Sequence, residues 1–226
     1  MEKSPAGETP IETYPALDRF GFVRAGFVCR IPGIEASGDR ELMLSRLESR
    51  HTQAREALGM GGMVYATAGQ THGNGVALVE EEPSGSRCFA GVDALVTAVP
   101  GIALGIYVAD CCAVYLVDPE RRCIGLAHSG KKGTELGVVP AAIEKMRTHF
   151  GSNPGGLVAQ LSPCIRPPFY EVDFAAEILR QCRDAGLKEI FDGGACTAAD
   201  LDKYYSYRAE RGKTGRMLAL FAMSGE

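Results

Sequence analysis

The sequence predicts an α+β fold, on three observations. Short β-prone runs and amphipathic helical stretches share the 226 residues without the regular strand–helix–strand alternation of a doubly wound sheet. Four apolar runs follow one another at short spacing between residues 92 and 127, with turn signals at Pro100-Gly101 and Asp118-Pro119. Hydrophobic residues make up 46% and charged residues 23% of the chain, as in a globular protein with a sizeable core. We expect a single domain over residues 1–226.

The N-terminal part of the chain predicts a tail, a strand and a helix. Residues 1–16 contain three prolines and mixed charge, which predicts a loose N-terminal tail. Residues 20–31 predict a strand or hairpin near a sheet edge. Residues 38–59 interleave apolar and charged positions, which predicts an amphipathic helix capped by Ser37 or Asp39 and stopped by its last glycine. The apolar positions expected to face the core are Leu42, Leu44, Leu47, Ala54 and Leu58.

The same criteria predict the remaining elements. The expected strands are 63–67, 75–79, 92–97, 103–108, 113–117, 123–127, 157–161 and 216–223. The expected helices are 138–150 with Pro140 near its start, 174–185 ended by Gly186, and 201–208. Residues 80–85 predict an acidic loop.

The charge and cysteine content exclude several classes of protein. A formal net charge of −4 offers no basic surface for nucleic acid. There is no long apolar run and no apolar signal segment after Met1, so we expect a cytoplasmic protein without membrane contact. The eight cysteines contain no C-x-x-C pair, which argues against a zinc ribbon. A reducing compartment makes a disulfide framework unnecessary.

Three groups capable of chemistry follow or end predicted strands. His72 comes after Gln70-Thr71, Cys111 after Ala109-Asp110, and His128 ends an apolar run before Ser129-Gly130-Lys131-Lys132-Gly133. Such side chains are well placed to converge in one pocket. In an extended strand Cys112 would point away from Cys111, and the pattern favours Cys111 as the residue that faces the pocket. The glycines after His128 allow positive φ and close approach to an anion.

These residue types fit two kinds of active site. Two histidines and a thiolate match a zinc site with three protein ligands and an open fourth position. Cys111 and His128 alone would instead form a thiolate–imidazole nucleophilic pair. Each residue also has an ordinary alternative: a surface-loop histidine for His72, a basic surface turn for His128, and a buried structural thiol for Cys111.

A set of motifs in unbroken order resembles one family. The motifs are Gln70-Thr71-His72-Gly73, Asp93-Ala94-Leu95-Val96-Thr97, Ala109-Asp110-Cys111, His128-Ser129-Gly130, Ser162-Pro163-Cys164-Ile165, Tyr170-Glu171-Val172, Cys196-Thr197, Tyr205-Ser206-Tyr207-Arg208 and Thr214-Gly215-Arg216-Met217. From about Thr67 to the C-terminus the chain resembles the family once called multicopper polyphenol oxidoreductase laccase, the YfiH-like proteins. The resemblance implies a four-layer α/β/β/α fold with mixed β-sheets. It also implies a Zn²⁺ ion held by His72, Cys111 and His128.

The resemblance implies purine nucleoside chemistry, namely phosphorolysis of adenosine- or inosine-type nucleosides and adenosine deamination. Its small-molecule partners would be a purine nucleoside and phosphate. The alternative is a peptidoglycan-precursor editing amidase that releases L-serine from a UDP-muramoyl intermediate with the same three residues. A third reading is a non-enzymatic zinc or thiol interaction module. Three ligands without a fourth are unlike a closed structural zinc site.

The substrate side of the site departs from the family pattern. Lys131-Lys132 stand where the family motif has Trp-Arg, so positive charge is kept but the planar fork of arginine is lost. The candidates for binding an anionic substrate are Lys131, Lys132, Arg208 and Arg216. Asp110 is a candidate to orient a ligand or carry a proton, with structural hydrogen bonding as its alternative. Multicopper oxidation is excluded, because its copper centres need many more histidine ligands than the four in this chain.

Overall fold

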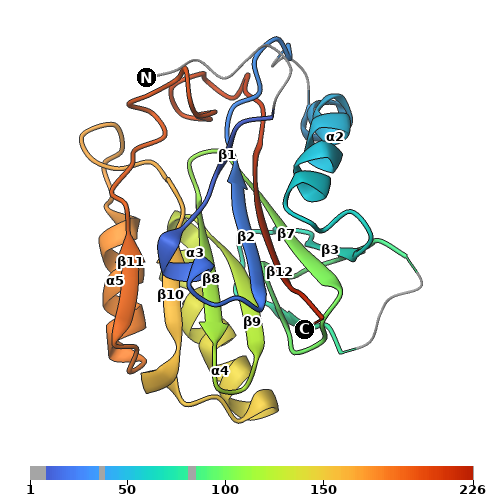
Figure 1. Ribbon diagram of the computed structural model, residues 1–226. Coiled ribbons are helices and arrows are strands. Elements are labelled where there is room, and N and C mark those ends of the chain that lie inside the picture. Colours follow the sequence, from blue (N-terminus) through green and yellow to red (C-terminus); the bar gives the residue numbers. More distant parts are fainter. Residues whose placement is uncertain (1–8, 36–38, 81–84, 226) are drawn as a thin grey trace.

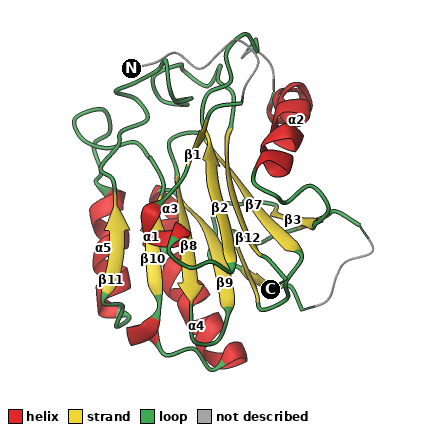
Figure 2. Cartoon of the chain, viewed as in Figure 1, coloured by secondary structure: helices red, strands yellow, loops and turns green. Residues whose placement is uncertain are grey.

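Two mixed six-stranded sheets face each other, with helices on their outer faces (Figure 1, Figure 2). The computed structural model describes residues 9–35, 39–80 and 85–225. Helix α2 (Arg40–Ala57) covers one sheet, and α4 (Val138–Phe150) and α5 (Phe174–Asp184) cover the other. The predicted α+β class with four α/β/β/α layers is confirmed.

The first sheet has the order β1-β2-β12-β7-β3-β5. Its strands are β1 (Ile11–Glu12), β2 (Val23–Val28), β12 (Met217–Met223), β7 (Ile102–Val108), β3 (Val64–Ala68) and β5 (Arg87–Phe89). Strand β3 runs parallel to both β5 and β7, and the other pairs are antiparallel. The outer face packs against α2, where the guanidinium of Arg55 lies 4.3 Å from the ring centroid of Tyr65. The short helix α1 (Pro15–Asp18) buries Leu17 in the core.

The second sheet has the order β11-β10-β8-β9-β6-β4. Its strands are β11 (Glu189–Asp192), β10 (Val158–Leu161), β8 (Cys112–Asp118), β9 (Cys123–Ser129), β6 (Ala94–Thr97) and β4 (Val76–Leu78). A short helix, α3 (Lys131–Glu135), follows β9 directly, and a 3₁₀ turn spans Pro154–Gly156. No described helix is both long and apolar enough to cross a lipid bilayer.

The core lies on both faces of the second sheet. In β8, Tyr115 and Val117 pack between the sheets, while Val114 and Leu116 pack against the helices. The ring of Tyr115 lies 5.4 Å from that of Phe221 in β12, and its hydroxyl donates to the Gly26 carbonyl at 2.8 Å. A strand buried on both faces has a continuous apolar sequence, which is the pattern that predicts this strand.

Most predicted elements are confirmed, with two corrections. Residues 1–8 lie outside the described residues, but the tail does not extend to residue 16, because Ile11 and Glu12 pair with β2. The predicted helix over 201–208 is wrong. Its backbone forms turns, in which the Lys203 amide donates to the Asp200 carboxylate and the Tyr204 carbonyl accepts from the Arg30 guanidinium. Side chains and distant partners replace the helical bonds there. Most of the predicted 80–85 loop lies outside the described residues.

Helix α2 forms where predicted but turns a slightly different face to the core. Asp39 caps it by accepting from the Leu42 amide at 2.9 Å, while Ser37 lies outside the described residues. Leu42 is exposed, whereas Met43 and His51 are buried with Leu47 and Ala54. The core positions predicted for Leu47 and Ala54 are confirmed and that of Leu42 is wrong, while Met43 and a histidine, His51, take core positions that were not predicted. The short elements β5, β11, α1 and α3 were not predicted.

Candidate metal centre

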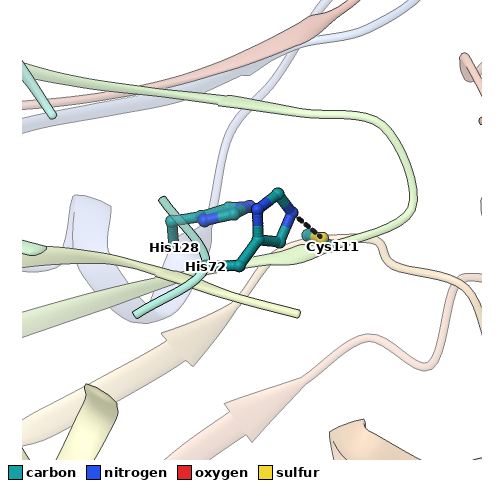
Figure 3. Close-up of side chains that lie close together, drawn as sticks. All are labelled: His72, Cys111 and His128. Atoms are coloured by element: carbon teal, nitrogen blue, oxygen red, sulfur yellow. Dashed lines mark hydrogen bonds between the residues drawn. The ribbon is translucent and has the colours of Figure 1, made fainter. Parts of the chain in front are cut away.

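His72, Cys111 and His128 come together at one place between the sheets. Their ligand atoms, one from each residue, all lie within 4.8 Å of one another (Figure 3). His72 lies in the loop after β3, Cys111 directly precedes β8, and His128 lies in β9. The Sγ of Cys111 is 4.0 Å from Nε2 of His72, and the two imidazole rings meet edge to face at 4.9 Å.

The β8–β9 pairing places the cysteine. Ala113 pairs with His128 and Cys112 with Ser129, so Cys111 lies at the mouth of the ladder beside Gly130. Cys112 is buried on the helix side of the sheet, which leaves Cys111 to face the pocket. A Cβ on Gly130 would lie only 2.4 Å from the Cys111 sulfur. Gly130 has a φ of −98°, so this glycine is required for space beside the thiol and not, as the sequence suggested, for a positive φ.

Asp93 organises both histidines, a role the sequence did not reveal. One carboxylate oxygen accepts from the His72 amide and faces Nδ1 of His128, both at 2.9 Å. The other accepts from the Thr71 amide and hydroxyl and from the Gly73 amide, at 2.8 to 3.1 Å. An ionised carboxylate only accepts, so Nδ1 of His128 carries the proton and Nε2 is left to face the centre.

Gln70 also holds the loop that carries His72 in place. The Gln70 amide group donates to the Tyr107 carbonyl and accepts from the Tyr107 amide, extending the hydrogen bonding at the end of β7. Five non-glycine residues among those described have a left-handed backbone, and four of them line the same cavity: Gln70, His72, Asp110 and Arg211. Such strain persists only where surrounding contacts hold it, and it gathers at functional sites.

The electrostatics of the centre favour a thiolate beside an imidazolium. Burial opposes ionisation of Cys111, but hydrogen bonds with His128 and His72 outweigh it and lower the thiol pKa to about 6. Burial also opposes the charged form of His128, but its bonds with Asp93 and Cys111 raise the pKa to about 9. For Asp93, the hydrogen bonds overcome the effect of burial and hold the carboxyl pKa well below its usual range.

These pKa values predict that binding of a metal ion by the three residues releases close to one proton midway between about pH 6 and pH 9. At that pH Cys111 is largely ionised, whereas His128 must give up the proton on Nε2 to become a ligand. Apparent affinity therefore rises with pH up to about 9. Calorimetric titration at about pH 7.5 in buffers of different ionisation enthalpy measures the number released. A value near zero would mean that His128 is already neutral in the metal-free protein.

The centre opens into a cavity of about 930 Å³ with a basic wall. Of the predicted substrate-binding residues, Lys131, Lys132, Arg208 and Arg216 all line it. The structure adds Arg40 and Arg211, and Asp110 is the one carboxylate among the described lining residues. Burial and the nearby charge of Arg40 lower the pKa of Arg216. Cations that repel one another in a concave site favour an anionic ligand.

Asp110 lines the cavity, but its oxygens are already engaged. One accepts from the Thr197 hydroxyl and the other from the Arg208 amide, both at 2.7 Å. These contacts support its structural alternative, since they tie the loops around Thr197 and Arg208 to the residue beside Cys111. A left-handed φ of 82° at Asp110 turns the chain into β8.

Comparisons with known proteins show which family the sequence matches. The sequence profile of the family described as multi-copper polyphenol oxidoreductase laccase matches residues 36–179 and 170–224. A protein of Streptomyces coelicolor named purine nucleoside phosphorylase is 30% identical over an alignment 226 residues long. The alignment covers 85% of this chain and 92% of that protein. One of the same name from Deinococcus radiodurans is 35% identical over 194 residues, covering 74% and 73%.

Solved structures show the same fold. The crystal structure of YlmD from Geobacillus stearothermophilus superimposes with a TM-score of 0.81 over 93% of this chain and 94% of YlmD, at 23% identity. YfiH from Bacillus licheniformis gives a TM-score of 0.78 over 89% and 93%, also at 23% identity.

Proposed function

The chain belongs to the family described as multi-copper polyphenol oxidoreductase laccase, and we propose that it is a zinc-dependent purine nucleoside enzyme rather than an oxidase. The proposed reaction is phosphorolysis of adenosine- or inosine-type nucleosides, together with deamination of adenosine. The observation that carries the proposal is the His72–Cys111–His128 cluster at the base of a cavity with a basic wall. The relatives named purine nucleoside phosphorylase support the same class.

The three residues suit a transition-metal ion such as zinc better than they suit magnesium. Two imidazoles and one thiolate are a borderline-soft donor set of the kind that zinc prefers. Asp93 orients His128 with the ring–carboxylate contact common behind metal-ligating histidines. A bound zinc ion would act as a Lewis acid toward negative charge that develops on the substrate.

The remaining chemistry belongs to the chain's own side chains. Basic residues on the cavity wall hold the phosphate and fix its approach to the sugar, which is a gain from orientation and charge. Lys131 and Lys132 begin helix α3, which follows the strand that carries His128. The positions of both lysines are therefore fixed relative to that proposed metal ligand. Neither lysine forms an ion pair with a carboxylate of the described residues, which leaves their charge for the substrate.

Replacing both Lys131 and Lys132 by alanine is expected to raise the KM for phosphate by at least about tenfold, because one charge-assisted hydrogen bond contributes about 1.5–3 kcal/mol and ~1.4 kcal/mol is a factor of ten. The KM for the nucleoside should change by less. Steady-state kinetics at varied phosphate measure both constants. Lys188→Ala is the matched control, because Lys188 is exposed and does not line the cavity. An unchanged KM for phosphate in the double variant would remove these lysines from the phosphate site.

Incubation of zinc-loaded protein with adenosine, with and without phosphate, tests the proposed function. Chromatography that separates adenine, inosine and hypoxanthine identifies the reaction. Adenine that appears only with phosphate indicates phosphorolysis, and inosine that forms without phosphate indicates deamination. If no product forms from adenosine or inosine under either condition, the proposed function is wrong.

One observation also favours a second function, the editing of a peptidoglycan precursor. The cavity volume of about 930 Å³ lies near the upper end of small-molecule sites, which span about 300–1,000 Å³. Its six basic side chains exceed what one phosphate requires and suit the diphosphate of a UDP-muramoyl substrate. Release of L-serine from that intermediate, assayed beside adenosine turnover, decides between the two.

A further inference from the structure

Tyr207 is an exposed aromatic side chain at the cavity. Large hydrophobic side chains that are strongly exposed among the described residues are Leu42, Leu136, Phe169, Leu201 and Tyr207. Tyr207 is 55% exposed and is the member of this set that lines the cavity. An exposed aromatic ring that lines a cavity offers a face on which a flat ligand can stack.

The backbone around Tyr207 is held rigidly next to the candidate metal centre. The amide of Arg208 donates to the Asp110 carboxylate at 2.7 Å, and Asp110 is the neighbour of Cys111 in the chain. The Tyr207 carbonyl accepts from the Gly212 amide at 2.8 Å and closes the loop. The Ser206 amide donates to Glu210, which also forms an ion pair with Arg30 at 2.7 Å. A ring on a fixed backbone loses little conformational freedom when it binds a ligand.

The ring of Tyr207 is flanked on part of its surface only. A Cβ on Gly212 would lie 3.4 Å from its Cζ and Oη atoms, so the glycine backbone runs alongside the ring. The guanidinium of Arg216 lies 5.9 Å from the ring centroid. The side chain is 55% exposed and lines the cavity, which leaves surface for a flat partner.

The other aromatic rings of the cavity are already engaged. The guanidinium of Arg208 lies 5.4 Å from the centroid of Tyr170, and Phe174 meets Tyr170 edge to face at 6.1 Å. Tyr107 packs against the buried ring of His51 at 5.6 Å and shares a hydrogen bond with Tyr65.

We propose that Tyr207 is the side chain on which the base of the substrate stacks, and that it sets the preference of the cavity for an aromatic base. This inference rests on the proposed nucleoside function. A purine offers a flat π-face to the ring, and stacking of this kind is strong and tolerant of base identity. Stacking on Tyr207 leaves the sugar to extend toward Cys111 and the phosphate toward the basic wall.

Binding of two ligands by the zinc-loaded native protein and its Tyr207→Ala variant tests the assignment. Adenosine carries the base, whereas ribose 1-phosphate carries the sugar and phosphate without it. The variant is expected to bind adenosine about 10- to 100-fold more weakly, the range that loss of one stacked base produces. Its Kd for ribose 1-phosphate should stay within about threefold. Isothermal titration calorimetry measures both constants.

Two further variants separate stacking from a general effect on the fold. Tyr207→Phe keeps the ring and is expected to restore adenosine binding. Phe169→Ala removes an exposed aromatic ring that does not line the cavity and should leave both constants unchanged. Equal weakening of both ligands in Tyr207→Ala would mean a structural role, and no weakening of adenosine would mean no stacking. Either result overturns the inference.

The outcome is distinguishable from failure of the proposed function. Native protein that converts adenosine, with an unchanged adenosine Kd in Tyr207→Ala, overturns the stacking role alone. Native protein that binds adenosine tightly without converting it overturns the proposed reaction, while the comparison of variants still measures stacking. Native protein that binds no adenosine overturns both.

Discussion

Replacing Cys111 by alanine is expected to abolish metal binding and to slow the proposed nucleoside phosphorolysis at least about 1000-fold, since a metal contributes several kcal/mol to the transition state and ~1.4 kcal/mol is a factor of ten. Cys111 is the only sulfur donor in the cluster, and its thiolate lies between two imidazoles. Two histidines alone leave too few donors to retain zinc.

Elemental analysis of protein purified without chelator, together with kcat under saturating substrate, measures this effect. Cys88→Ala is the matched control, because Cys88 is an exposed free cysteine in β5, outside the cavity. It should keep both the metal and the activity. Full metal content and unchanged turnover in Cys111→Ala would show that the three-residue centre is not the metal site.

Replacing Asp93 by alanine is expected to destabilise the protein by about 3–5 kcal/mol, the range for a buried ion pair that loses one partner. The change leaves the His128 imidazolium without its counter-ion and removes the acceptor for three successive backbone amides, those of Thr71, His72 and Gly73. Asp93→Asn keeps the shape but turns an amide N–H₂ toward donors, so it should also fail to restore the loop.

Metal affinity is the second readout for Asp93. Loss of the partner behind a ligand typically costs ~10- to 100-fold in affinity, and competition with a chromophoric chelator measures it. Denaturant unfolding gives the stability. Asp118→Asn is the control, since Asp118 is a buried carboxylate that accepts two amides in the β8–β9 turn, away from the centre. It should lose stability but keep its zinc affinity. Equal zinc affinity in native protein and Asp93→Asn would contradict the positioning role.

The lowered pKa of Asp93 also gives this contribution a pH range. The ionised carboxylate is the form that the native contacts favour, so its stabilisation is present above the ordinary Asp pKa of 3.8. It is lost as the pH falls below that value toward the lower native pKa. Acid unfolding of Asp93→Asn should therefore show a weaker dependence on pH in that range than acid unfolding of the native protein.

Much of the fold could be predicted because buried strands and helices have recognisable patterns of apolar residues. Strands β7, β8 and β9 are apolar on both faces, and α5 ends at Gly186, whose φ is 99°. The predicted helix over residues 201–208 is wrong because the Tyr204 carbonyl accepts from the guanidinium of Arg30, a partner far away in the sequence. A local pattern carries no record of such a partner.

The proposed metal ligands of the candidate site could be predicted from the sequence, but the residues that surround and position them could not. Histidine and cysteine are recognisable as metal ligands or nucleophiles by residue type, and the order of the motifs identified His72, Cys111 and His128 as candidates. Asp93 lies in the predicted 92–97 strand and in one of the motifs, but nothing in the sequence assigns it the amides of Thr71, His72 and Gly73 as donors. Tyr207 and Arg40 come from segments on either side of the cavity, and only the folded chain shows that they meet.

The position of the ligands in the chain has a consequence for how the protein responds to change. His72 lies where the chain passes from β3 in one sheet to β4 in the other, and Cys111 where it passes from β7 to β8. An ion held there would link the connections between the two sheets. Any substitution that lets one sheet slide over the other, even at the distant contact of Tyr115 with Phe221, would pull the donors apart. The packing between the two sheets thus helps to set the positions of the donor atoms.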